Sequence, residues 1–252
     1  MNDSTPQTLA KVPEVTLGFW LIKTAATTLG ETGGDAVSMS MDLGYLLSTG
    51  IFAALFVVAV GAQIKARGFH PLLYWLTIIA TTTVGTTLAD WADRSLGIGY
   101  FGGSALLLAL LVGSLWTWQR TLGSVSVHSV STPKAEAFYW VTIMFSQTLG
   151  TALGDWTADS LDFGYGGATL VFGGLLALIV AAYCGTRVSR TVLFWTAFIL
   201  TRPLGAVVGD FLDKPLSEGG LSLSRYAASA TLVALMLVGI LVFKQRPAKA
   251  AH

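Results

Sequence analysis

Four acidic residues recur at the same place in four similar stretches of the chain. The stretches read TTLGETGGD, TTVGTTLAD, QTLGTALGD and RPLGAVVGD, and each ends in an Asp five residues after a shared Gly. The four acids are Asp35, Asp90, Asp155 and Asp210. Carboxylate oxygens suit hard cations such as Mg²⁺, Ca²⁺ and Mn²⁺, and Na⁺ or protons fit them equally well. The repeat therefore predicts a cation site or path built from equivalent acids.

The acids lie in strongly apolar surroundings. The 252 residues are 53% hydrophobic and only 12% charged, whereas a soluble domain carries about 25% charged residues. The apolar runs approach the length of a bilayer crossing, about 20 residues. We therefore predict an all-α membrane protein, and no nucleic-acid partner is expected, although the net charge of +1 gives no information on this point. The eight expected transmembrane helices cover about 13–33, 45–64, 71–91, 100–119, 136–156, 165–184, 191–211 and 225–243.

An aromatic–Trp pair marks the start of each repeat. The four Trp residues are Trp20, Trp75, Trp140 and Trp195, and the shared Gly follows each one ten residues later. The repeats, about 13–64, 71–119, 136–184 and 191–243, each hold two spans, and a polar linker at about 120–135 separates the halves of a single transmembrane domain, 1–252. Because each repeat has an even number of spans, all four are expected to be parallel around a pseudo-symmetry axis along the membrane normal.

A polar stripe is predicted on the odd-numbered helices. Seven residues before each Asp, on the same helical face, stand Thr28, Thr83 and Thr148 in the first three repeats. The even-numbered helices carry almost no polar residues, so we expect the odd helices inside and the even helices against lipid. The alternatives remain open: the Asp residues could end the helices in solvated loops, the Thr hydroxyls could bond their own backbone, the Gly residues could serve helix packing, and the Trp residues could pack or form an interfacial belt.

Three further charges lie inside the expected spans. Glu31 occurs only in the first repeat, and Lys23 and Arg202 lie near the middle of their spans. Charged groups at this depth are costly and are functional candidates, and a buried cation needs a partner. We expect Glu31 and the repeated Asp residues to pair with Lys23 and Arg202, either as a structural ion pair or as a movable pair that opens when a cation or proton arrives.

The basic residues predict the orientation. Ten of the 15 Lys and Arg residues flank the spans on the side of the N-terminus and three flank them on the opposite side. By the positive-inside rule both termini are expected to be cytoplasmic. The first fifteen residues are polar, so we expect no cleaved signal peptide, and the single cysteine makes a thiolate metal site improbable.

The fourfold repeat resembles a family of bacterial membrane proteins built from four tandem copies of a two-span repeat of unknown function, usually called uncharacterised membrane-anchored proteins. The aromatic–Trp pair and the Gly-x4-Asp spacing carry the resemblance, which covers about 13–243. It implies a multi-pass protein of the bacterial inner membrane with a Trp in each repeat. The fourth copy departs most from the pattern, because Arg202 and Pro203 precede its Gly.

These residues predict an integral membrane cation transporter or channel, with a divalent metal such as Mn²⁺ favoured as cargo. The expected ion ligands are Glu31, Asp35, Asp90, Asp155 and Asp210, the expected path-lining residues are Thr28, Thr83 and Thr148, and the expected charge-balancing or gating residues are Lys23 and Arg202.

No enzyme activity and no cofactor are expected, and the expected partners are membrane lipid and the cation. No direction of transport and no oligomeric state follow from the sequence. A non-catalytic membrane scaffold or partner subunit is the alternative. A remote alternative is an intramembrane enzyme, because Gly154-Asp155 and Gly209-Asp210 resemble the Gly-Asp of membrane aspartyl proteases, although the matching Tyr-Asp is missing.

Overall fold

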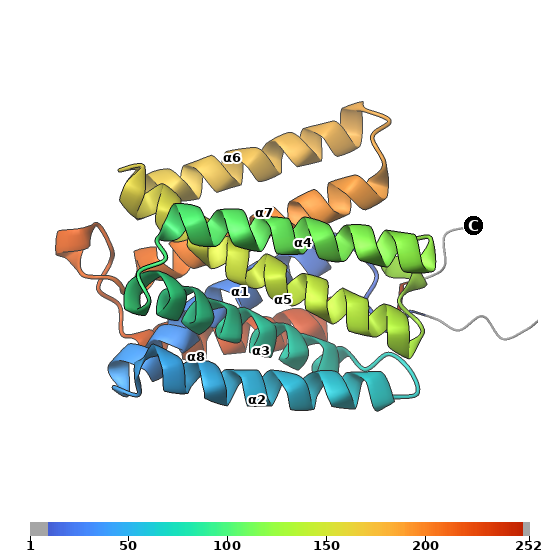
Figure 1. The fold of residues 1–252 in the computed structure, drawn as a ribbon, viewed down its shortest axis with the longest axis horizontal. Coiled ribbons are helices and arrows are strands. Elements are labelled where there is room, and N and C mark those ends of the chain that lie inside the picture. The colour runs from blue at the N-terminus through green and yellow to red at the C-terminus, as the bar shows by residue number, and fades with distance from the viewer. Residues whose placement is uncertain (1–9, 249–252) are drawn as a thin grey trace, which may run out of the picture.

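The computed structural model describes residues 10–248 as a bundle of helices (Figure 1). Eight α-helices are present in this part of the chain. Short π-helical or 3-10 turns follow several of them. The α-helices are α1 (Leu17–Asp35), α2 (Gly44–Lys65), α3 (Pro71–Asp90), α4 (Tyr100–Leu122), α5 (Pro133–Asp155), α6 (Gly164–Gly185), α7 (Arg190–Asp213) and α8 (Arg225–Val242).

The helix boundaries follow from local chemistry. Thr16 caps α1, since its hydroxyl accepts a hydrogen bond from the Phe19 amide, which satisfies one of the free amides of the first turn. α3 and α5 each start with Pro71 or Pro133, a residue suited to a position where no amide partner is needed. α4 ends at Gly123, which adopts the left-handed conformation that glycine reaches without steric cost.

The four odd helices form a closed ring. α1 packs on α3, α3 on α5, α5 on α7, and α7 on α1. Each even helix packs mainly on the odd helix of the following repeat: α2 on α3, α4 on α5, α6 on α7, and α8 back on α1 (Figure 1). The two helices of one sequence repeat therefore do not pack mainly on each other. The even helix of each repeat packs on the odd helix of the next repeat.

A repeated glycine contact closes the ring. In all four pairs of neighbouring odd helices, the shared Gly lies directly against the residue three positions before the shared Gly of the next repeat. A side chain on the Gly would overlap or press on that neighbour, so small residues set the helix spacing, as predicted. The four contacts are Gly30 with Thr82, Gly85 with Gln147, Gly150 with Arg202 and Gly205 with Thr27.

The two sets of helices differ sharply in burial. In the apolar 18-residue windows of α3 and α7, 67% of the residues are buried, against 6–22% in the four even helices. Exposed apolar side chains such as Leu46, Leu170 and Leu241 cover the even helices. The prediction that odd helices lie inside is confirmed. Six helices are long and apolar enough to cross a membrane: α2, α3, α4, α6, α7 and α8.

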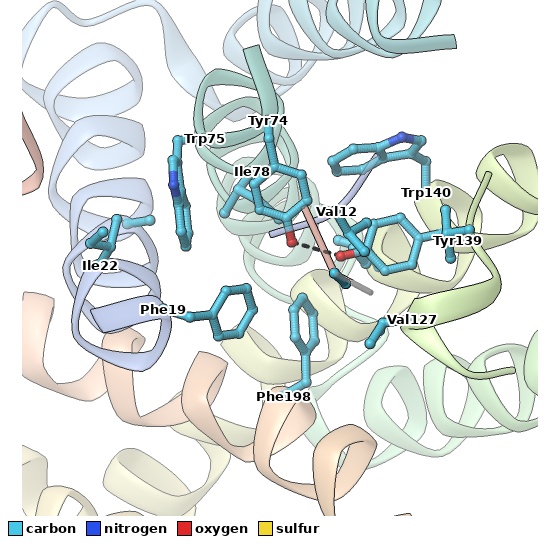
Figure 2. Close-up of a cluster of buried hydrophobic side chains, with 14 of the residues drawn as sticks. Val12, Phe19, Ile22, Tyr74, Trp75, Ile78, Val127, Tyr139, Trp140 and Phe198 are labelled. Atoms are coloured by element: carbon cyan, nitrogen blue, oxygen red, sulfur yellow. Dashed lines mark hydrogen bonds between the residues drawn. The ribbon is translucent and has the colours of Figure 1, made fainter. Parts of the chain in front are cut away.

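An aromatic layer fills the ring near the start of the odd helices (Figure 2). The Tyr74 and Tyr139 hydroxyls are 2.6 Å apart and share a hydrogen bond. Trp75 and Trp140 are only 1% and 2% exposed, so of the two alternatives for the repeated Trp residues, packing describes these two. The segment 10–14 lies between the linker and the segment 244–248, since its backbone is hydrogen-bonded to both.

The glycine contact generates a stability prediction. A Cβ on Gly205 would lie 2.8 Å from the backbone carbonyl carbon of Thr27, and a backbone atom cannot rotate out of the way. We expect Gly205→Ala to destabilise the protein by about 1–3 kcal/mol through overpacking, measured by thermal unfolding in detergent.

The matched control is Gly113→Ala on α4, where no atom lies within 4 Å of the added Cβ. Because Ala is the better helix former, this variant should be as stable as the wild type or more so. Equal melting temperatures for the two variants would refute the role of the glycine contact.

Candidate functional site

The four repeated Asp residues are buried at one end of the ring. Asp35, Asp90 and Asp155 are the last residues of α1, α3 and α5, and Asp210 lies within α7. Only 1–3% of the surface of each of these four residues is exposed. The alternative that they sit in solvated loops is therefore wrong. A π-helical turn follows each of the first three, at 36–40, 91–95 and 156–160. Such turns are frequent at functional sites.

Two basic residues bridge neighbouring acids. Lys214 Nζ lies 2.5 Å from Asp35 Oδ2 and 3.0 Å from Asp210 Oδ1. Arg94 Nε lies 3.0 Å from Asp90 Oδ1, and its Nη2 lies 3.7 Å from Asp155 Oδ2. The four Asp residues are thus tied together in two pairs.

A third base completes this end. Arg225 Nε lies 3.0 Å from Asp213 Oδ2 and 3.8 Å from Asp35 Oδ2. Burial alone would lower the pKa of Lys214, but Asp210, Asp35 and Asp213 outweigh it and raise that pKa above its ordinary value, so the amine stays protonated. These three bases are the three that the sequence places on the side opposite the N-terminus.

Sequence reasoning missed these bases as partners of the acids. The spacing of Asp90 to Arg94 and of Asp210 to Lys214 is four residues, which places both members on one helical face. That spacing could have predicted both contacts. No local spacing could have predicted the contact of Arg225 with Asp35, because it depends on the packing of α8 on α1.

A buried ion pair lies one layer deeper. Arg202 Nη2 donates to Glu31 Oε2 at 2.9 Å, and it also donates to the hydroxyls of Thr86 at 2.5 Å and Thr151 at 2.6 Å. Glu31, Thr86 and Thr151 hold the same position after the shared Gly in three repeats, and Ala206 holds it in the fourth. One guanidinium therefore joins all four odd helices, and the predicted pairing of Glu31 with Arg202 is confirmed.

Lys23 does not pair with an acid. Its Nζ donates to the Phe198 carbonyl at 3.1 Å and lies 3.9 Å from the centre of the Phe198 ring. In the described part of the chain no carboxylate lies within ion-pair distance of it. The expectation that Glu31 or a repeated Asp would neutralise Lys23 is wrong, because Glu31 is held by Arg202 and the Asp residues lie further along the bundle.

The three Thr residues predicted to line the path make local hydrogen bonds. Thr28, Thr83 and Thr148 are buried, but their hydroxyls donate to carbonyls of their own helices. Thr83 also lines an apolar groove between α1, α2, α3 and α8. The residue just before each of them, Thr27, Thr82 or Gln147, makes the glycine contact instead. These bonds agree with the alternative that the Thr hydroxyls bond their own backbone, and the role of the three residues in lining an ion path stays a prediction.

Three carboxylates come close enough to share one cation. Oxygens of Glu31, Asp35 and Asp90 lie within 4.8 Å of one another, and all three side chains are buried. Asp35 Oδ1 and Asp90 Oδ2 have no hydrogen-bond partner in the described residues. An unpartnered carboxylate oxygen in such a site is costly, and a cation would satisfy it. We call Glu31, Asp35 and Asp90 the acidic triad.

The remaining acids are divided differently from the predicted fourfold set. Asp35, Asp210 and Asp213 form a second close group. Lys214 and Arg225 contact its members, as Arg202, Lys214 and Arg94 contact those of the acidic triad. In residues 10–248, Asp155 belongs to neither group. The geometry therefore divides the acids into two close groups of three and does not form a symmetric fourfold ring. The acidic triad is the group that includes the deeper Glu31.

Comparison with known proteins places these features in a class of tandem-repeat helical proteins. A family model described as Repeat of Unknown Function (DUF347) matches four times, at residues 18–69, 73–123, 138–189 and 193–247. The chain belongs to this family. No curated protein and no solved structure was found to match it.

The Glu31–Arg202 pair generates a prediction about stability. Removing only one partner leaves the other charge buried without compensation, which costs about 3–5 kcal/mol. We expect Arg202→Met and Glu31→Gln each to lower the melting temperature strongly in detergent. The double variant should recover much of the loss, because neither charge then remains. Additive effects of the two substitutions would show that the pair is not coupled.

Proposed function

We propose that the chain is an integral membrane cation transporter or channel that binds its cargo at the acidic triad. The observation that carries the proposal is the approach of Glu31, Asp35 and Asp90 to within 4.8 Å of one another while two of their oxygens stay unpartnered. All-oxygen ligands suit hard cations, and a divalent metal such as Mn²⁺ is the favoured cargo. Na⁺ and protons fit the same oxygens.

The proposal includes eight membrane crossings. α1 and α5 carry more charge than a typical crossing, but each packs between two other odd helices and one even helix, so their charges need not meet lipid. The same Gly meets the same position of the next odd helix in all four pairs. Neighbouring helices share such a register when they run in one direction, which supports parallel repeats around an axis along the membrane normal.

We further propose a bacterial inner-membrane location with both termini cytoplasmic. Basic residues are concentrated at the loops on the side of the N-terminus, and the positive-inside rule assigns that side to the cytoplasm. The acidic triad would then face the opposite side. The negative field of the acids there would attract cations.

In this scheme Glu31 connects cation binding at the triad with the positive charge of Arg202, which opposes cation passage. It belongs to the acidic triad and also holds Arg202 at 2.9 Å. A cation at the triad would compete with Arg202 for Glu31, and the freed guanidinium would be drawn from its place among Thr86 and Thr151. In the arrangement described, Arg202 and Lys23 place positive charge below the triad and oppose cation passage, as in a closed state.

A membrane scaffold or partner subunit is the second candidate. It is favoured by the dense pairing of the interior, where Arg202 alone contacts three side chains and Lys214 contacts two acids. A scaffold would use these pairs only to hold the helices together, and it would pass no ion.

Flux measurements separate the two candidates. We expect wild-type protein in proteoliposomes to pass at least one of Mn²⁺, Mg²⁺, Ca²⁺, Na⁺, K⁺ and protons. Asp90→Asn should lower that flux at least about tenfold, which corresponds to about 1.4 kcal/mol, because it removes one carboxylate charge from the triad.

The matched control is Asp162→Asn, since Asp162 is exposed and lies outside the acidic triad. It should retain wild-type flux. If folded wild-type protein passes none of these ions, the scaffold is the better description and the transport proposal fails.

A further inference from the structure

A second polar cluster lies in the middle of the ring, on the side of the acidic triad nearer the helix starts. It consists of one side chain from each odd helix: Lys23 of α1, Thr82 of α3, Gln147 of α5 and Arg202 of α7. All four are 0% exposed. We call these four residues the mid-bundle cluster.

The cluster is held together by the contacts that close the ring. Thr82, Gln147 and Arg202 each press on the shared Gly of the preceding repeat. Lys23 donates to the carbonyl of Phe198, which lies one turn before Arg202 on α7, about 6 Å along the helix axis. Lys23 stands one turn nearer the helix starts than the position that Thr82, Gln147 and Arg202 share in their repeats, and each odd helix contributes one side chain.

Many polar atoms of this layer have no partner. In the described residues, Arg202 Nε and Nη1, both amide atoms of Gln147 and the Thr82 hydroxyl make no hydrogen bond. Buried polar groups are nearly always paired, and each orphaned group costs about 1–3 kcal/mol. Hydrogen-bond donors are in excess here, because guanidinium and ammonium groups donate only.

The charge of the layer is also unbalanced. Glu31 neutralises Arg202, whereas Lys23 contacts the carbonyl and the ring of Phe198 and has no ion pair within residues 10–248. A buried ammonium without a counter-charge is strongly unfavourable. An anion beside Lys23 would supply the counter-charge that its ammonium form lacks, and it would accept hydrogen bonds from the surplus donors.

We propose that the mid-bundle cluster binds a small monovalent inorganic anion of the halide class, such as chloride. The Arg202 Nε–H and Nη1–H, the Gln147 amide and the Thr82 hydroxyl would donate to it, and Lys23 would supply the balancing charge. The complete enclosure by close-packed helices favours a small ion over a larger carboxylate or phosphate. This site shares Arg202 with the Glu31 pair but uses other atoms of the guanidinium, and it does not depend on cation transport.

Thermal unfolding in matched salts tests the site. A ligand that binds only the folded state raises its melting temperature. In divalent-free buffer at constant sodium concentration, we expect chloride to raise the melting temperature by about 3 °C or more relative to gluconate, an anion too large for the layer.

Two variants make the result specific. Lys23→Met and Gln147→Leu should each abolish the difference between chloride and gluconate. The control is Lys65→Met, which is the same Lys-to-Met change at an exposed position at the end of α2. It should keep the wild-type difference between chloride and gluconate. If one cluster variant fails to fold, the other decides.

Diffraction from crystals grown in bromide would then locate the ion. We expect an anomalous peak beside Arg202 Nε and the Gln147 amide. The proposal is overturned if wild-type protein melts at the same temperature in both salts, if both cluster variants retain the chloride effect, or if no bromide peak appears in the layer.

Discussion

The buried pair of Glu31 and Arg202 is the interaction on which the interior of the bundle depends. Arg202 reaches from α7 to Glu31 on α1 and to threonines on α3 and α5, so one side chain crosslinks the whole ring. An arginine this deep is costly without a carboxylate partner. The fourfold repeat therefore cannot be symmetric at this level: one copy supplies the cation, one supplies the anion, and two supply hydroxyls. Function built on this layer must be asymmetric too.

The glycine contacts allow that layer to form. The same packing explains why the repeated Asp residues lie close together. Close approach at each shared Gly brings the ends of α1, α3, α5 and α7 together, and with them the four repeated Asp residues. Lys214, Arg94 and Arg225 offset much of the resulting repulsion. Two oxygens of the acidic triad remain unpartnered. Unpartnered carboxylate oxygens are what a cation site requires. Along the axis, the end of the ring holds the Asp residues with their three bases, and Arg202 and Lys23 lie below them.

Much of the architecture could be predicted from the sequence, because it follows from periodicity. The repeat spacing and the contrast between polar and apolar helices indicated which helices lie inside. The pairing of Glu31 with Arg202 was predictable, because each is a charge that occurs in one repeat only and lies within an expected span. The partner of Lys23 was not, since a carbonyl and a ring leave no mark in the sequence. The partners of the Thr28, Thr83 and Thr148 hydroxyls, which are carbonyls of their own helices, were left open, because periodicity gives the face of a residue and not the partner of its hydroxyl. The swap of each even helix onto the next repeat depends on long-range packing alone.

The location of a bound cation tests the central claim most directly. Crystals of the wild-type protein grown with Mn²⁺ would be measured at the manganese absorption edge. An anomalous peak within about 2.0–2.6 Å of oxygens of Glu31, Asp35 and Asp90 is the result expected for a cation-binding triad. A well-ordered triad with no peak from any of the candidate metals, or a peak bound only at surface carboxylates, would contradict it.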